Sequence, residues 1–222
     1  MFQPFCYNSS LMNITKNNGF CIISDKTSGM EIGYIEGESF ERCDYRNNPL
    51  PKGEYECCQF LSCDFSDGDL SNCKFTDCEF AGCNLSLAKL SNAIFRDVIF
   101  KDCKMLGLQF NSCNEFGLSF SFENCILNHC TFHKTKIIKT HFKNSQLQEV
   151  DFIGCDLTSS FFDNCDLLRA TFHNTIIEKT DFRTSYNYSI DPEINRIKKA
   201  KFSIDGICGL LEKYDIVIDR SV

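Results

Sequence analysis

Residues 142–162 read FKNSQLQEVDFIGCDLTSSFF, and every fifth residue of this stretch is large and apolar: Phe142, Leu147, Phe152, Leu157 and Phe162. The same spacing runs without a gap from Phe122 to Phe182, and most of these residues follow a small or β-branched residue two positions earlier. Side chains return to the same face about every 3.6 residues in an α-helix and at every second residue in a β-strand, so neither element explains a period of five. The pattern therefore predicts an internal repeat, and a fixed period of this kind is the sequence signature of a repeat architecture.

A second period of twenty residues lies inside the first, because Phe stands over Phe and Leu over Leu at that spacing. Four five-residue units then make one coil with four sides. Strands in register lie about 4.8 Å apart, and identical side chains stacked at that distance can fill a narrow interior. We expect a core ladder formed by Phe60, Phe80, Phe100, Phe122, Phe142, Phe162 and Phe182.

Short motifs carry a family resemblance: Cys-Asp-Leu-Thr-Ser at 155–159, Cys-Asp-Leu-Leu-Arg at 165–169 and Cys-Asn-Leu-Ser-Leu at 83–87. The sequence resembles the pentapeptide-repeat family over residues 35–182. The resemblance implies an all-β solenoid, a right-handed quadrilateral β-helix. Because repeats of this kind contact only their neighbours, the solenoid should be one continuous body.

The ends of the chain differ from this body. Residues 1–29 carry no five-residue beat, so we expect residues 1–34 to be an irregular N-terminal extension, with the folded body starting near Met30. The β-helix should then cover residues 35–182, and a cap should follow at 183–222. The chain has neither a long apolar run nor a basic start before one, so we expect no transmembrane helix and no secretory signal.

The phase of the five-residue repeat shifts by two residues between Phe110 and Phe122. Keeping the earlier phase would place Glu115 inside, and a lone buried carboxylate is costly. A two-residue insertion within 111–121 avoids this, and we expect Phe116 to fill the open side of the coil.

Sixteen cysteines suggest disulfides or a zinc site at first sight, but most of them follow the beat. A position two before each central residue points into the coil, where a free Cys packs as a small apolar side chain. A column of thiols could also bind a soft metal, but an apolar interior offers no basic group that lowers a thiol pKa. We therefore expect reduced, packed cysteines and a cytoplasmic protein. The residues in this position are Cys43, Cys58, Cys63, Cys73, Cys78, Cys83, Cys103, Cys113, Cys125, Cys130, Cys155 and Cys165.

No catalytic constellation is recognisable, and we expect neither an enzyme nor a cofactor or metal site. The four histidines, His129, His133, His141 and His173, all fall on outward positions. Two of them, His133 and His173, share one side but lie two coils apart, roughly 10 Å by strand spacing. That separation is too great for a nucleophile and its base. Phosphate-binding and metalloprotease motifs are also missing from the sequence.

The C-terminal segment should close the solenoid. Arg183–Ile190 interrupts the beat, Ser203 can cap a helix that runs to about Tyr214, and Asp215–Asp219 is typical of a short strand. A β-helix end exposes strand edges that need covering, so a short C-terminal capping helix is the simplest interpretation. In Qnr-type relatives a similar tail also joins two rods, and the resemblance implies a homodimer here. The expected cap and dimer residues are Leu210, Leu211, Ile216 and Ile218.

Charge is uneven along the chain, whose net charge is −7. Residues 35–124 carry 15 acidic and 8 basic residues, and residues 125–182 carry 7 and 6. An acidic protein is a poor direct ligand for nucleic acid. Resemblance to Qnr-type quinolone-resistance and microcin-immunity members implies instead a DNA mimic that binds DNA gyrase or topoisomerase IV. The alternative is a structural scaffold for protein–protein interaction with an unknown partner.

Overall fold

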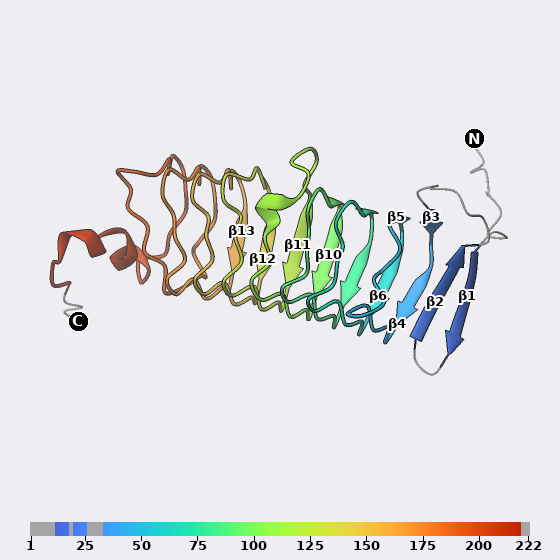
Figure 1. The fold of residues 1–222 in the computed structure, drawn as a ribbon. Coiled ribbons are helices and arrows are strands. Elements are labelled where there is room, and N and C mark those ends of the chain that lie inside the picture. The colour runs from blue at the N-terminus through green and yellow to red at the C-terminus, as the bar shows by residue number, and fades with distance from the viewer. Residues whose placement is uncertain (1–11, 18–19, 26–32, 219–222) are drawn as a thin grey trace, which may run out of the picture.

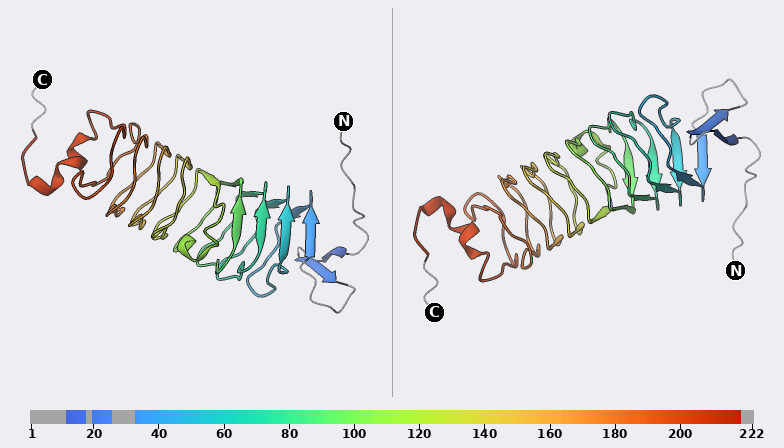
Figure 2. Two further views of the ribbon diagram at one scale, coloured as in Figure 1. Left: turned by 90° about the horizontal axis from the view of Figure 1, so that it is seen from above. Right: turned by 90° about the horizontal axis from the view of Figure 1, so that it is seen from below.

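The computed structural model describes residues 12–17, 20–25 and 33–218. Over the last of these ranges the chain winds into a right-handed β-helix whose coils stack along one axis (Figure 1). Views from above and below show the same stack, with β3 near one end and short 3-10 turns at the other (Figure 2). Within the described part of the chain, no helix is both long and apolar enough to cross a membrane.

One side of the coil, which we call side 2, is a parallel sheet of seven strands. In spatial order these strands are β4 (Ser39–Glu41), β6 (Gln59–Leu61), β8 (Glu79–Ala81), β10 (Val98–Lys101), β11 (Phe120–Glu123), β12 (His141–Lys143) and β13 (Phe161–Asp163). Their register places Phe on Phe from Phe40 to Phe162. The stack continues to Phe182, with neighbouring ring centroids 4.5–5.3 Å apart.

The adjoining side, side 1, carries a four-stranded parallel sheet of β3 (Gly33–Glu36), β5 (Gly53–Glu56), β7 (Lys74–Thr76) and β9 (Ile94–Arg96). Beyond residue 120 it continues as single parallel bridges, from Lys136 through Asp156 and Ile176 to Arg196. The remaining two sides consist of bridges of the same kind: side 3 runs from Asp44 to Tyr186, and side 4 from Asp69 to Thr171. The central residues of all four sides are buried, so the predicted four-sided solenoid is confirmed.

The position two before each centre has a second role besides fitting the interior. A thiol or hydroxyl group at this position can donate a hydrogen bond to the carbonyl oxygen of the preceding side's central residue, one coil earlier. The thiols of Cys63, Cys83 and Cys103 donate in this way over 3.2 Å, to Phe40, Phe60 and Phe80 respectively. Hydroxyl groups do the same, as Thr175 does to Phe152 over 2.9 Å and Thr180 to Leu157 over 2.8 Å. A short side chain with one donor therefore links successive coils through a carbonyl oxygen. The Phe152 oxygen, for example, accepts from both the Thr175 hydroxyl and the Cys155 amide.

The corners of the coil are formed by residues with positive φ, two positions after each centre. Lys139 and Asn144, for example, have φ of 59° and 49°. Their amide groups donate to carbonyl oxygens of the following coil, at Thr158 and Asp163. The left-handed conformation costs a non-glycine residue about 1–2 kcal/mol, and this ladder bond, made at most of the corners, offsets the cost.

The insertion in the middle of the rod lies on side 1, between the 3-10 turn η1 (Phe110–Ser112) and β11. Phe100 pairs with Phe122 across it, so the coil is two residues longer than its neighbours. The expectation that Phe116 fills the interior is wrong, because its side chain is 76% exposed. Phe120 fills the space instead: it pairs with Val98 and packs against Phe110 and Phe122, with centroids 5.3 and 5.1 Å away.

The N-terminal expectation is partly wrong. Strands β1 (Met12–Asn17) and β2 (Phe20–Asp25) pair with each other as antiparallel strands, so these two segments are not irregular. Met30 lies outside the described residues. The parallel ladder itself begins with β3, whose Ile35 pairs with Tyr55 of β5.

The C-terminal boundary expected at Phe182 comes one coil too early. Phe202 stacks on Phe182, with the centroids 5.5 Å apart and the ring planes 2° from parallel, and Asp181 bridges to Lys201. In place of one capping helix, the chain forms two 3-10 turns, η2 (Ile207–Leu210) and η3 (Glu212–Tyr214). The strand expected at 215–219 is not formed, because residues 215–218 have no regular structure and Asp219 lies outside the described residues.

Candidate interaction surfaces

Side chains capable of catalysis or metal binding do not converge in the described part of the chain. No group of three or more His, Cys, Asp or Glu residues there could hold a metal ion. The histidines point outward: His129 lies 3.3 Å from Glu149 and His133 lies 3.5 Å from Asp151. His141 stacks on Phe161 with the ring centroids 4.5 Å apart.

The twelve cysteines that stand two positions before a central residue are buried, at most 9% exposed. Burial raises the pKa of the Cys113, Cys130 and Cys155 thiols to about 12, so these groups are protonated and poor nucleophiles. All but one of the twelve are free thiols. The expectation of reduced cysteines fails at Cys43, which is disulfide-bonded. Cys57 and Cys208 are free and exposed.

The acidic half of the rod keeps much of its negative charge unneutralised. Some carboxylates are paired: the hydrogen bond from Arg46 lowers the pKa of Asp44 to about 2, and Lys74 lies 2.7 Å from Glu54. Others make no ion pair with any described residue and are distributed mainly over sides 1 and 2. These are Glu36, Glu38, Glu41, Glu56, Asp67, Asp77, Glu79, Asp97, Asp102 and Glu115.

The loop that contains the insertion stands out of the rod between β10 and β11 (Figure 1). It is fixed at both ends, because the Asn114 amide donates to the Ala93 carbonyl and the Ser119 hydroxyl donates to Asp97 over 2.7 Å. Gly117 has φ of 82° and packs beside the Arg96 side chain, so the turn suits glycine there. The loop therefore holds Phe116 in solvent.

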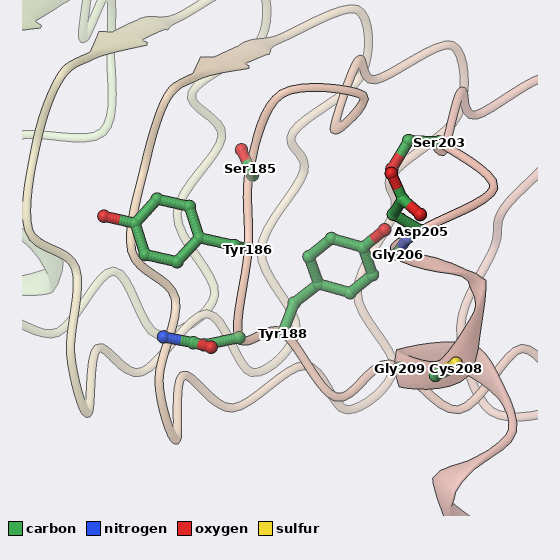
Figure 3. Close-up of a pocket in the computed structure, with 9 residues that line it drawn as sticks. Ser185, Tyr186, Tyr188, Ser203, Asp205, Gly206, Cys208 and Gly209 are labelled. Atoms are coloured by element: carbon green, nitrogen blue, oxygen red, sulfur yellow. Dashed lines mark hydrogen bonds between the residues drawn. The ribbon is translucent and has the colours of Figure 1, made fainter. Parts of the chain in front are cut away.

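At the C-terminal end, a hollow of about 330 Å³ lies where the last coil meets the 3-10 turns. Figure 3 shows Tyr188 extending between Tyr186 and the segment from Ser203 to Gly206. A Cβ atom on Gly206 or Gly209 would overlap Tyr188, so these glycines allow the turns to close over the ring. The Tyr188 ring is 5% exposed, and its hydroxyl group has no hydrogen-bond partner among the described residues.

The four predicted cap and dimer residues divide into two pairs. Leu210 packs against the core and Leu211 is half-buried, so both belong to the cap. Ile216 and Ile218 are 56% and 43% exposed, beside Val217 at 96%. Lys213 holds this tail to the last coil through Asp191 and Glu193, both 2.7 Å away.

Comparison with family models decides the relationship. A model described as "Pentapeptide repeat region" matches residues 115–182, and one described as "Pentapeptide repeats (8 copies)" matches residues 58–97 and 78–114. The chain belongs to the pentapeptide-repeat family. No curated protein sequence gives a significant match.

Solved structures of pentapeptide-repeat proteins agree with this fold. Two trypsin-treated variants of QnrB1, a plasmid-mediated fluoroquinolone resistance protein, match with TM-scores of 0.66 and 0.67 at 18% and 19% identity. These matches cover 84% of this chain and 92% and 89% of the QnrB1 chains. Full-length QnrB1 matches with a TM-score of 0.50 at 19% identity, covering 83% of this chain and 100% of its own. At this identity the likeness concerns the fold.

Proposed function

We propose that this pentapeptide-repeat protein is a non-catalytic rod that binds DNA gyrase or topoisomerase IV in place of DNA, through its acidic N-terminal half. The observation that carries the proposal is the set of carboxylates on side 2 with no basic partner among the described residues. Glu41 and Glu79 lie in β4 and β8, and Asp102 lies at the corner that follows β10, on a side whose strands repeat at about 4.8 Å. Negative charge spread along this side suits a surface that otherwise binds phosphate groups.

Two further points support this proposal. QnrB1, which has the same fold, is a fluoroquinolone resistance protein. The side chains of this chain offer binding surfaces and, in the described part, no metal cluster. A resistance phenotype for this chain is thus part of the proposal, and so is its action in the cytoplasm, where the enzymes are found.

We further propose that two rods join at their C-terminal ends. Ile204 and Val217 are 91% and 96% exposed there, next to Ile216 and Ile218. Large apolar side chains grouped at one end of a monomer commonly mark an association site. A two-fold dimer would present two acidic halves to a two-fold enzyme, which a single rod cannot do.

Supercoiling by purified gyrase tests the proposal. The wild-type protein should inhibit supercoiling or protect it from a fluoroquinolone at micromolar concentration. The triple variant Glu41→Lys, Glu79→Lys, Asp102→Lys should lose the effect. A control with the same change in net charge, Glu149→Lys, Asp163→Lys, Glu212→Lys, alters exposed residues of the other half and should retain it. No effect of the wild type on either enzyme, or equal effects of both variants, would contradict the proposal and favour the scaffold alternative.

The dimer is tested separately by sedimentation. At high salt, which screens contacts between charged residues, the wild type should sediment as a dimer. The variant Ile216→Asp, Val217→Asp should give folded monomers under the same conditions, because both side chains are exposed and their loss leaves the cap intact. A wild type that remains monomeric at the concentrations of the supercoiling assay would remove this part of the proposal.

A further inference from the structure

The charge of side 1 changes sign at the insertion loop. The outward positions of this side are the residue before each central residue and the two residues after it. Before the loop, these positions carry five acidic and two basic residues. They are Glu36, Glu54, Glu56, Asp77 and Asp97, against Lys74 and Arg96. After the loop, its outward positions carry six basic and two acidic residues. They are Lys136, Lys139, Lys179, Arg196, Lys198 and Lys199, against Asp156 and Glu178.

Most of the basic residues on this side are available for a partner. Arg196 pairs with Glu178 over 2.7 Å. The other five make no ion pair with any described residue. Counting charges along the sequence hides this cluster, because acidic residues on the other sides of the same coils offset its basic residues.

Apolar side chains occupy the boundary between the two charged halves. Phe116 projects from the loop at 76% exposure, and Ile138, one coil further along, is 43% exposed. Ile94, one coil before the loop, is half-buried. An apolar centre flanked by charged residues is the usual arrangement of a protein interface, and an exposed aromatic residue at that centre is a typical anchor.

We infer that side 1 is the interface for a second copy of this chain, which lies antiparallel with its loop against the loop of the first. A two-fold axis through the two loops, perpendicular to the rods, brings each coil before the loop opposite the coil equally far after it. It also keeps each residue column opposite itself. Asp97 then faces Lys139 of the other copy, Glu36 faces Lys198 and Lys74 faces Asp156.

Each of these contacts occurs twice, as a two-fold interface requires. One opposed pair is unfavourable, Glu56 against Glu178, but Arg196 already neutralises Glu178. A parallel arrangement of the rods would instead place acid on acid and base on base. A nucleic acid along this side would meet the basic half but would be repelled by the acidic half, so a bipolar partner fits better.

This interface is independent of the proposed topoisomerase binding, which uses side 2, and of the C-terminal joint. Pairing would cover the acidic half of side 1. A concentrated solution of the protein should therefore hold rods associated side by side as well as end to end.

A charge-swap experiment tests the inference in the background Ile216→Asp, Val217→Asp, which removes the C-terminal joint. One variant carries Glu36→Lys and Asp97→Lys, and the other carries Lys139→Glu and Lys198→Glu. All four positions are exposed, and the fold of each variant is checked by circular dichroism. Sedimentation at low salt should show the parent self-associating, and each variant alone associating at least tenfold more weakly. An equimolar mixture should recover the association, because both sets of pairs are restored in the mixed dimer.

Phe116→Asp provides a second test that does not depend on the swaps. Its ring is exposed, so the fold should remain while self-association falls at least tenfold. A parent that stays monomeric at low salt would overturn the inference, and so would variants that associate like the parent or a mixture that fails to recover. These results leave the supercoiling assay unaffected, so failure of one proposal is distinguishable from failure of the other.

Discussion

Two adjacent phenylalanines of β13 provide the sharpest test of the register. Phe162 is 1% exposed and stacks between Phe142 and Phe182, with centroids 4.7 and 4.8 Å away. Phe161, the preceding residue, is 40% exposed and touches mainly the His141 ring. Changing either residue to Ala removes the same atoms from the same strand. Any difference in stability therefore reports which side chain lies inside.

Phe162→Ala should cost about 3–5 kcal/mol, because it leaves a cavity in the stack. Phe161→Ala should cost about 1–2 kcal/mol, since the ring is partly in solvent and loses one aromatic contact. For a chain of this size 1 kcal/mol shifts Tm by roughly 2–4 °C, so the two melting temperatures should differ by at least about 2 °C.

Thermal melts followed by far-ultraviolet circular dichroism measure this difference directly. A one-residue slip of register moves every side chain to the opposite face. Equal losses for the two variants, or a larger loss for Phe161→Ala, would therefore refute the assigned core.

Three other predictions follow from the interior and the loop. A thiol reagent should label Cys57 and Cys208 in the native protein, while the buried thiols react only after denaturation, and rapid native labelling of Cys83 or Cys103 would contradict the packing. Folded pKa values near 12 for Cys113, Cys130 and Cys155 mean that their contribution is complete below the unfolded value near 9 and is lost as pH rises toward 12. Urea titrations should show stability falling by about 1.4 kcal/mol per thiol for each pH unit in this window, and Cys155→Thr should reduce the slope. Phe120→Ala should lower the free energy of unfolding by about 3–5 kcal/mol, whereas Phe116→Ala should change it by less than about 0.5 kcal/mol, and the reverse order would restore the original placement of Phe116.

The regular part of the fold could be predicted because each core position repeats many times in the sequence. Phe142 is identified as buried by its own five-residue phase and by Phe122 and Phe162 at the twenty-residue spacing. The donor role of the thiols is harder to see, because Cys, Ser, Thr and Ala are all small. Only the geometry shows Cys83 reaching the carbonyl oxygen of Phe60 in the coil before.

Irregular segments lack this redundancy. Phe116 and Phe120 are both apolar residues within the inserted coil, and the sequence does not say where the two extra residues sit. The pairing of Phe120 with Val98 decides the question. At the N-terminus, the lack of a five-residue period suggested irregular structure, yet β1 and β2 pair with each other as antiparallel strands.

The candidate surfaces were only partly accessible from the sequence. Counting charge along the chain finds the acidic half but misses the basic residues of side 1, since residues on different sides are mixed in the sequence. Lys139 and Lys198 are separated by 59 positions, yet the bridges from Lys136 to Arg196 place them on one side of the rod. The expected capping helix does not form for a local reason. Gly206 and Gly209 allow the chain to close over Tyr188, and two 3-10 turns form there instead.

The central claim is that this rod occupies the DNA-binding surface of a type II topoisomerase, and competition with DNA tests it most directly. Purified gyrase would be titrated with fluorescently labelled protein, with and without a saturating DNA duplex, and binding followed by anisotropy. The account predicts binding in the micromolar range or tighter, weakened by salt, abolished in the Glu41→Lys, Glu79→Lys, Asp102→Lys variant and prevented by bound DNA. Absence of binding, or equal binding to free and DNA-bound gyrase, would contradict it.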